Sequence, residues 1–221
     1  MVLAGPVVPA SAQQTINASW GHFTMRSQGR VETDLLLIEH HDLVFEIGDF
    51  NGAMVGAEWL VAIGERYEAG LGVSYMQRTV PTEHVRAIDT GGAGIPRTLG
   101  LRQIPLAVTA RVLPLGQSYR VQPYAGGGIA LIAWRFSESG DFALSNGRVF
   151  RDEEYQATGS AVGPVLVFGM RVAGDRLAFG AEGRYQKARG SFGPSFARVV
   201  DPDIDLDGWT LGVTAGLRIG R

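Results

Sequence analysis

The last stretch of the chain alternates strictly between apolar and polar residues. From Asp207 to Ile219 it reads DGWTLGVTAGLRI, with apolar side chains at the odd positions from Trp209 onward. A period of two predicts a β-strand with one apolar and one polar face. At about eleven residues it exceeds the ~5–6 of an average globular strand and matches the ~9–11 that cross a bilayer at a tilt. The pattern therefore predicts a membrane-spanning strand with Trp209 at an interface.

Composition narrows the class of protein. No apolar run reaches the ~18–20 residues of a membrane-spanning helix, so a helical membrane protein is not expected. The net charge of −2 argues against a nucleic-acid partner. Because the chain has no cysteine, disulfides and thiolate metal sites are excluded. Glycine supplies 31 of 221 residues, which suits the crowded inner positions of a coiled barrel.

Seven further stretches have the character of strands, although the first is weakly alternating and the fifth has ambiguous faces. Long connections alternate with short turns between them, as in outer-membrane barrels with long outer loops and short periplasmic turns. We therefore expect an all-β fold, an eight-stranded antiparallel up-and-down transmembrane β-barrel. The predicted strands are residues 17–26, 52–63, 67–78, 100–113, 119–136, 158–172, 176–187 and 207–219, and the predicted long connections are 27–50, 80–99, 137–156 and 188–206.

Two local features predict irregular pairing. Pro105 lies inside a predicted strand, where the missing N–H leads us to expect a bulge or a lost ladder bond. The glycine run at residues 126–128 suggests a bulge in the next strand. At the N-terminus, residues 1–14 end in a small-residue A-x-A pattern and are interpreted as a signal-peptide remnant. The barrel domain is then expected over residues 15–221.

Several stretches carry a resemblance to a known family. VQPYAGGGIAL at residues 121–131, FGAEGRYQ at 179–186 and DLDGWTLGVTAGLRI at 205–219 resemble the small bacterial outer-membrane β-barrel family of OmpA-, OmpX- and OmpW-like proteins. The resemblance implies a location in the outer membrane and the lipid bilayer as a partner. It further implies contacts with lipopolysaccharide or extracellular ligands through the long loops. It says nothing specific about activity.

Charged residues on the polar faces are the candidate functional residues. Glu58, Arg111, Glu182 and Arg184 all face a lumen just wide enough for side chains, where charges must pair. We interpret them as a structural network that closes the lumen, with a gated pore as the alternative. Aromatic residues are expected to mark the membrane interfaces: Trp59, Tyr67, Tyr75 and Trp209.

The leading functional hypothesis is a non-enzymatic protein with a structural or surface-interaction role. The alternatives are a narrow channel for small or hydrophobic solutes, a lipid-modifying enzyme, and a soluble lipocalin-like carrier, whose interior should be apolar. A lipid-modifying enzyme would need a His and Ser pair, yet no histidine follows His84. His40 and His41 are expected in a solvated loop rather than a metal site. No cofactor is expected.

Overall fold

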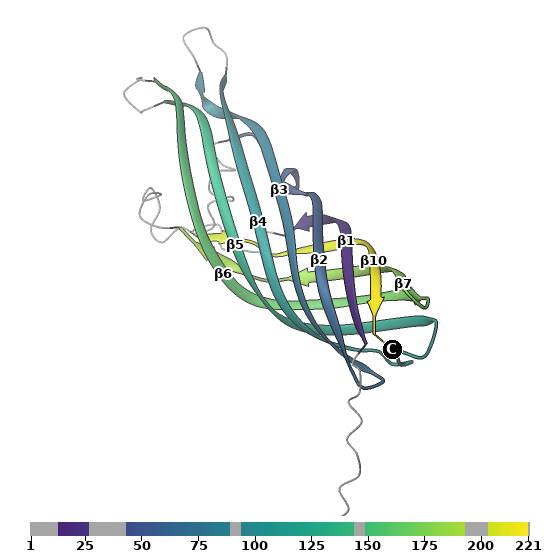
Figure 1. The fold of residues 1–221 in the computed structure, drawn as a ribbon. Helices are drawn as coiled ribbons and strands as arrows, with labels where there is room; N and C mark the ends of the chain where they lie inside the picture. Colours follow the sequence, from purple (N-terminus) through teal and green to yellow (C-terminus); the bar gives the residue numbers. More distant parts are fainter. Residues whose placement is uncertain (1–12, 27–42, 89–93, 144–148, 193–202, 221) are drawn as a thin grey trace, which may run out of the picture.

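The computed structural model describes residues 13–26, 43–88, 94–143, 149–192 and 203–220. Eight antiparallel strands close into a ring in the order β1-β10-β7-β6-β5-β4-β3-β2 (Figure 1). The predicted up-and-down barrel is thereby confirmed. Within the described part of the chain, no helix has the length and apolar character to traverse a membrane. The barrel strands are β1 (Gln14–Met25), β2 (Gly52–Ile63), β3 (Tyr67–Ile88), β4 (Gly94–Val112), β5 (Val121–Ala143), β6 (Val149–Ala173), β7 (Leu177–Gln186) and β10 (Gly208–Ile219).

Smaller elements lie at one end of the ring. A one-turn 3-10 helix, η1 (Ile47–Phe50), precedes β2. Two three-residue strands, β8 (Arg189–Ser191) and β9 (Asp203–Asp205), form a separate antiparallel pair between β7 and β10. We call this end the upper end. The turns β2–β3, β4–β5 and β6–β7 lie at the lower end with the C-terminus (Figure 1).

The strands are unequal in length. β3, β4, β5 and β6 have 19 to 25 residues, whereas β1, β2, β7 and β10 have 10 to 12. The four long strands rise above the others as one wall of the molecule (Figure 1). The predicted long loops at 80–99 and 137–156 were therefore wrong, because most of these residues continue the strands. The connections that remain, 89–93 and 144–148, lie outside the described residues.

The physical reason for this error is that a strand beyond the bilayer needs no apolar outer face. Thr98 pairs with Ser139 and Gly100 with Ser137, so the ladder between β4 and β5 continues where the outward residues are polar. Alternation of hydrophobicity detects a lipid-facing strand and misses its water-facing extension. The strand β1 was weakly predicted because apolar residues lie on both of its faces: Trp20 is exposed and Phe23 is buried.

An apolar belt surrounds the barrel. On β10, Leu211 is 60% exposed and Val213 is 56% exposed, so the apolar face of this strand points outward, as predicted. A soluble protein rarely exposes such a large continuous apolar surface, and this belt is the surface that a bilayer covers. All eight barrel strands contribute, with Ile16, Val55, Leu71, Val108, Ile129, Leu166, Phe179 and Val213 as examples.

The two expected irregularities resolve differently. The ladder from β4 to β3 omits Ile104 and Pro105, then resumes in the same register, so the proline causes lost pairing rather than a bulge. The register of β5 stays continuous through residues 126–128, so the bulge predicted there was wrong. These glycines instead permit a close approach of strands. A Cβ on Gly128 would lie 1.9 Å from the carbonyl oxygen of Val108.

Candidate functional site

Four charged side chains meet in the lower half of the lumen. Arg111 on β4 lies 2.5 Å from a carboxylate oxygen of Glu58 on β2 and 3.0 Å from one of Glu182 on β7. Arg184, also on β7, lies 3.4 Å from Glu58 and 3.1 Å from Glu182. The four side chains are 0 to 15% exposed. The structure thus brings together all four charged residues named from the sequence, in a network whose formal charges cancel.

The network depends on glycines in the strand between β2 and β4. Glu58 must cross the inner face of β3 to reach Arg111. Gly70 and Gly72 face the lumen there, and a Cβ on Gly70 would lie 2.9 Å from Glu58 Oε1 and 2.6 Å from Thr109 Oγ1. A side chain at this position would occupy the space that the carboxylate uses. The AGLGV segment of β3 therefore makes room for an ion pair between strands that are not neighbours.

Uncharged groups complete part of the network. The hydroxyl of Tyr124 on β5 donates a hydrogen bond to Glu182 Oε2 at 2.9 Å. The guanidinium carbon of Arg111 lies 4.8 Å from the centroid of the Tyr124 ring, a cation–π distance. Arg111 Nε and Nη1 are buried and have no hydrogen-bond partner among the described residues. A buried guanidinium held by two carboxylates and a ring is costly to leave unpaired, so the four charges depend on one another.

A second ion pair lies nearer the lower end. Arg171 on β6 forms a two-pronged contact with Glu68 on β3, with Nη1 donating to Oε2 at 3.1 Å. Its Nε donates to Gln122 Oε1 at 2.7 Å, and Gln122 donates to the backbone carbonyls of Gln117 and Tyr119 in the β4–β5 turn. Sequence reasoning missed Arg171. Its inward parity, opposite to Met170 and Val172, was the signal that could have identified it.

The upper half of the lumen is mainly apolar. Aromatic and aliphatic side chains from six barrel strands pack with the segment before β2, where Leu43, Phe45 and Phe50 are buried. Phe192, after β8, packs edge-on against Trp134 and Phe136. The lumen is therefore layered, with the four-charge network below and hydrocarbon above it, and a further buried ion pair joins Arg97 of β4 to Glu138 of β5 higher on the wall. The cluster includes Phe23, Met54, Met76, Leu99, Leu101, Ile132, Val165, Ile204 and Leu206.

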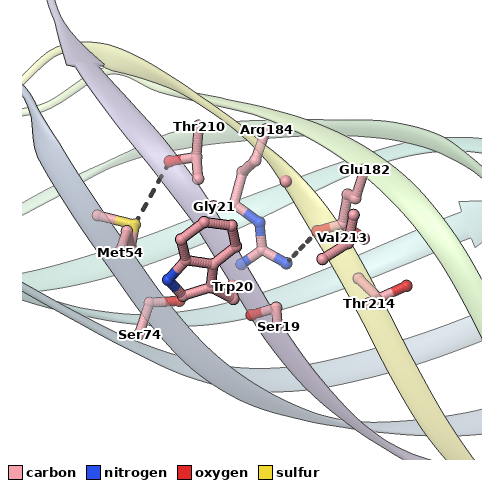
Figure 2. Close-up of a pocket in the computed structure, with 11 residues that line it drawn as sticks. Ser19, Trp20, Gly21, Met54, Ser74, Glu182, Arg184, Thr210, Val213 and Thr214 are labelled. Carbon is pink, nitrogen blue, oxygen red and sulfur yellow. Dashed lines mark hydrogen bonds and ion pairs between the residues drawn. The ribbon is translucent and has the colours of Figure 1, made fainter.

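A small cavity at the seam between β1 and β10 is lined by residues of both layers, including Met54, Glu182 and Arg184. Figure 2 shows Arg184 reaching toward Glu182 beside it, with Thr210 donating to the sulfur of Met54 at 3.4 Å. The cavity has a volume of about 30 Å³, enough for one or two water molecules. Gly21 and Gly212 pair across the seam, and a Cβ on Gly212 would lie 2.4 Å from the carbonyl oxygen of Trp20. The first and last strands therefore close the ring at a glycine pair.

Of the four predicted interface aromatics, Tyr67 and Trp209 lie at strand ends, whereas Trp59 and Tyr75 pair with the belt residues Leu71 and Val55. Tyr67 begins β3 at the lower end and is 59% exposed. Trp209 lies at the upper end of β10, with its ring 4.8 Å from that of Tyr185. Trp59 is set deeper, but its indole N–H donates to Gln14 Oε1 at 3.1 Å, close to the lower end. Tyr75 hydrogen-bonds through its hydroxyl to Gln77, just above the belt.

Within the described ranges, no three metal-ligating side chains gather into a site. His40 and His41, expected in a solvated loop, lie outside the described residues, as do residues 1–12 of the proposed signal remnant. His22 faces outward on β1. Ser137 and Ser139 are on β5, four places away in a ring of eight strands. These two serines thus lie on the opposite side of the barrel from His22.

Comparison with known proteins identifies the fold. No family model and no curated protein matches the chain. The crystal structure of the outer membrane protein OprG from Pseudomonas aeruginosa is similar, with a TM-score of 0.56 and 12% sequence identity over 96% of this chain and 97% of that one. Neisserial surface protein A gives a TM-score of 0.49 and 11% identity over 92% and 96%. The fold is that of a small outer-membrane β-barrel, and the apolar belt shows that it spans a lipid bilayer.

Proposed function

We propose that this protein has a structural or surface-interaction role without enzymatic activity. It has the fold and the lipid-facing belt of a small outer-membrane β-barrel. The outer membrane of a bacterium is where barrels of this kind reside. In this role the lower part of the barrel, which carries the apolar belt, is a closed anchor in the bilayer. The wall of β3 to β6 presents residues above it. Lipopolysaccharide or extracellular ligands are the partners proposed for this upper end.

The layered lumen is the observation that carries this proposal. The lower half is filled by paired charges, and the upper half contains fully buried side chains such as Phe23, Phe50 and Phe136. An interior of packed hydrocarbon resembles a domain core rather than a water-filled pore. The apolar belt, meanwhile, is incompatible with the soluble lipocalin-like carrier. His22 faces outward on β1, and Ser19 on the same strand has the opposite, inward parity, so these two side chains do not form the His and Ser pair that a lipid-modifying enzyme would need.

A narrow channel for hydrophobic solutes is the second candidate. The specific observation in its favour is the apolar lining of the upper lumen. A route through it would require Leu43, Phe45 and Phe50 to move away from the barrel axis. The charged layer below would still oppose an apolar solute, because separating its ion pairs exposes unpaired buried charges.

Single-channel recording of the refolded protein in a planar bilayer tests the leading role. We expect no steady ion conductance. We also expect vesicles carrying the barrel to accumulate a hydrophobic dye no faster than protein-free vesicles. Steady conductance would contradict the closed anchor and make a polar pore the better description. Barrel-dependent dye uptake without conductance would instead favour the channel for hydrophobic solutes.

A further inference from the structure

A polar hollow lies on the outer surface of the wall, directly above the apolar belt. It is formed by outward-facing residues of β3, β4 and β5 and encloses about 320 Å³, within the size range of small-ligand sites. Two arginines and several hydroxyl groups line it: Thr79, Thr98, Arg102, Arg135, Ser137 and Ser139. It is separate from the lumen, and the closed-anchor role leaves it without a function.

The two arginines face each other across neighbouring strands. Arg102 on β4 and Arg135 on β5 are direct partners in the ladder. Like charges in directly opposed positions destabilise a sheet. Neither guanidinium forms an ion pair with a carboxylate of the described residues, and Glu138, between Arg135 and the strand end, pairs with Arg97. The sheet therefore holds two adjacent positive charges that an anion between them would neutralise.

The surrounding groups are arranged as hydrogen-bond donors. Arg135 is oriented by Gln156 on β6, whose amide oxygen accepts a hydrogen bond from Nε at 2.7 Å when it faces the guanidinium. Gly100 lies on the outward face of β4, opposite Ser137. A Cβ there would lie 2.5 Å from Ser137 Oγ, so the missing side chain keeps the floor of the hollow open. Guanidinium and hydroxyl groups in this arrangement match a phosphate group, which accepts several hydrogen bonds.

The position of the hollow relative to the apolar belt indicates which anion could reach it. Toward the lower end from Arg102 and Arg135, the outward residues become apolar, with Leu106 and Leu131 exposed to lipid. Gln77, which pairs with Arg102, accepts the hydroxyl hydrogen bond of Tyr75, a residue predicted to lie at the membrane interface. The arginines therefore lie at the level where the hydrocarbon layer ends and the lipid headgroups begin.

We propose that this hollow binds a phosphate group of an outer-leaflet lipid headgroup, with Arg102 and Arg135 clamping the phosphate and the Ser and Thr hydroxyls donating to it. The phosphorylated glycolipid of the outer leaflet, lipopolysaccharide, presents such groups at this level. The inference depends on the proposed placement in the outer membrane with the wall outside. It names the wall, rather than the loops, as the lipid-binding surface.

Lipid retention by the detergent-solubilised barrel tests the site, with native mass spectrometry as the readout. The probes are bisphosphorylated lipid A, its phosphate-free counterpart, and inorganic phosphate alone. We expect retention of bisphosphorylated lipid A, about tenfold weaker in R102Q/R135Q because two charge-assisted contacts are lost. The variant R66Q/R176Q makes the same charge change in exposed lower turns and should behave as the wild type. G100L should also weaken retention, because it fills the hollow without changing charge.

Equal retention of lipid A by R102Q/R135Q and the wild type would overturn the proposal. So would equal retention of the phosphate-free lipid by the wild type, because acyl contacts would then suffice. If inorganic phosphate binds as well as lipid A, the hollow is an anion site that does not select lipid, which also contradicts the proposal. Conductance is measured in a separate experiment. Steady conductance would therefore contradict the closed-anchor role, whereas unchanged lipid retention by the variants would contradict the lipid site.

Discussion

Glu58 and Arg111 form an ion pair across a strand that carries no side chain between them. The two residues are on β2 and β4, and their contact of 2.5 Å passes over Gly70 and Gly72 of β3. Directly opposed residues on neighbouring strands are the ordinary unit of side-chain pairing in a sheet. Here the pair joins strands one place further apart, so it ties three strands into one unit.

Removing Arg111 should be the most damaging single change in this network. Arg111→Ala leaves Glu58 and Glu182 buried with one fewer partner, and we expect a loss of ~3–5 kcal/mol in the free energy of unfolding. Arg184→Ala should cost less, because its side chain is 15% exposed. Urea titration of the barrel in lipid vesicles measures both. The double variant E58A/R111A should lose less than the sum of its single changes by ~0.5–3 kcal/mol, and strict additivity would contradict a coupled pair.

The glycine groove of β3 gives a second prediction. Gly70→Val places a branched side chain where Glu58 and Thr109 now lie, so we expect ~1–3 kcal/mol of destabilisation from overpacking. The same urea titration measures this change. Gly48→Ala is the control, because the nearest atom to its Cβ would be 3.6 Å away. If Gly70→Val leaves stability and the Glu58–Arg111 coupling intact, the groove is not needed.

The lipid face of β10 can be tested by an inserted charge. Val213 lies near the middle of the strand and is 56% exposed, so Val213→Arg should cost ~2–4 kcal/mol, as expected for arginine at the bilayer midplane. Leu211→Arg, three residues from the upper end of β10, should cost less. Refolding into vesicles gives both values. A neutral Val213→Arg would mean that the outward face of β10 does not contact lipid.

Stability should depend on pH through Asp207, which lies above the membrane-spanning part of β10. Burial, and then the neighbouring charge of Asp205, raises the pKa of Asp207 from 3.8 to about 6. Because the folded protein binds this proton more tightly, its contribution to stability is fully present below pH ~4 and is lost as the pH rises through about 6. From pH 4 through pH 5 to pH 8, the urea midpoint of the wild type should therefore fall more than that of Asp207→Asn.

An asparagine oxygen can still accept the 2.7 Å hydrogen bond that the backbone N–H of Ala188 donates to Asp207. The variant thus removes the titration and keeps the contact. Asp175→Asn, in an exposed lower turn, is the control and should titrate as the wild type does. Parallel pH profiles for the wild type and Asp207→Asn would rule out this group as the cause.

The orientation of the barrel can be tested with single cysteines, since the chain has none. Glu154→Cys on the upper part of β6 should react with a membrane-impermeant thiol reagent on intact cells. Glu65→Cys in the β2–β3 turn should react only after the outer membrane is permeabilised. The prediction follows from the wall at the upper end and the short turns at the lower end. Labelling in the opposite pattern would invert the assignment.

The sequence predicted the spanning parts of the barrel well where one face alone is apolar. β2 was predicted at its observed bounds, and the lipid face of β10 was assigned correctly. β5 was ambiguous for a physical reason. Ile129 and Leu131 face lipid while Ile132 and Trp134 fill the upper lumen, so both faces are apolar and the alternation disappears.

The charged layer was accessible to sequence reasoning because charges on an inner face have to pair. The partner strands were not, because the crossing of Glu58 over β3 depends on glycines whose role appears only in three dimensions. The apolar upper lumen was missed for the same reason. Its members come from six barrel strands and from segments before β2 and after β8, and no local pattern connects them.

The difference in strand length gives the molecule a direction at the cell surface. The four long strands of one side continue beyond the upper ends of the four short strands of the other side (Figure 1). With the wall outside, as proposed above, a large molecule in the external medium meets a steric screen when it approaches from the β4 side and has a low rim to cross from the β1 side. Neighbouring copies that turned their screens toward one another would enclose the lipid between them. Copies that turned their short-strand sides toward one another would leave the lipid between them uncovered.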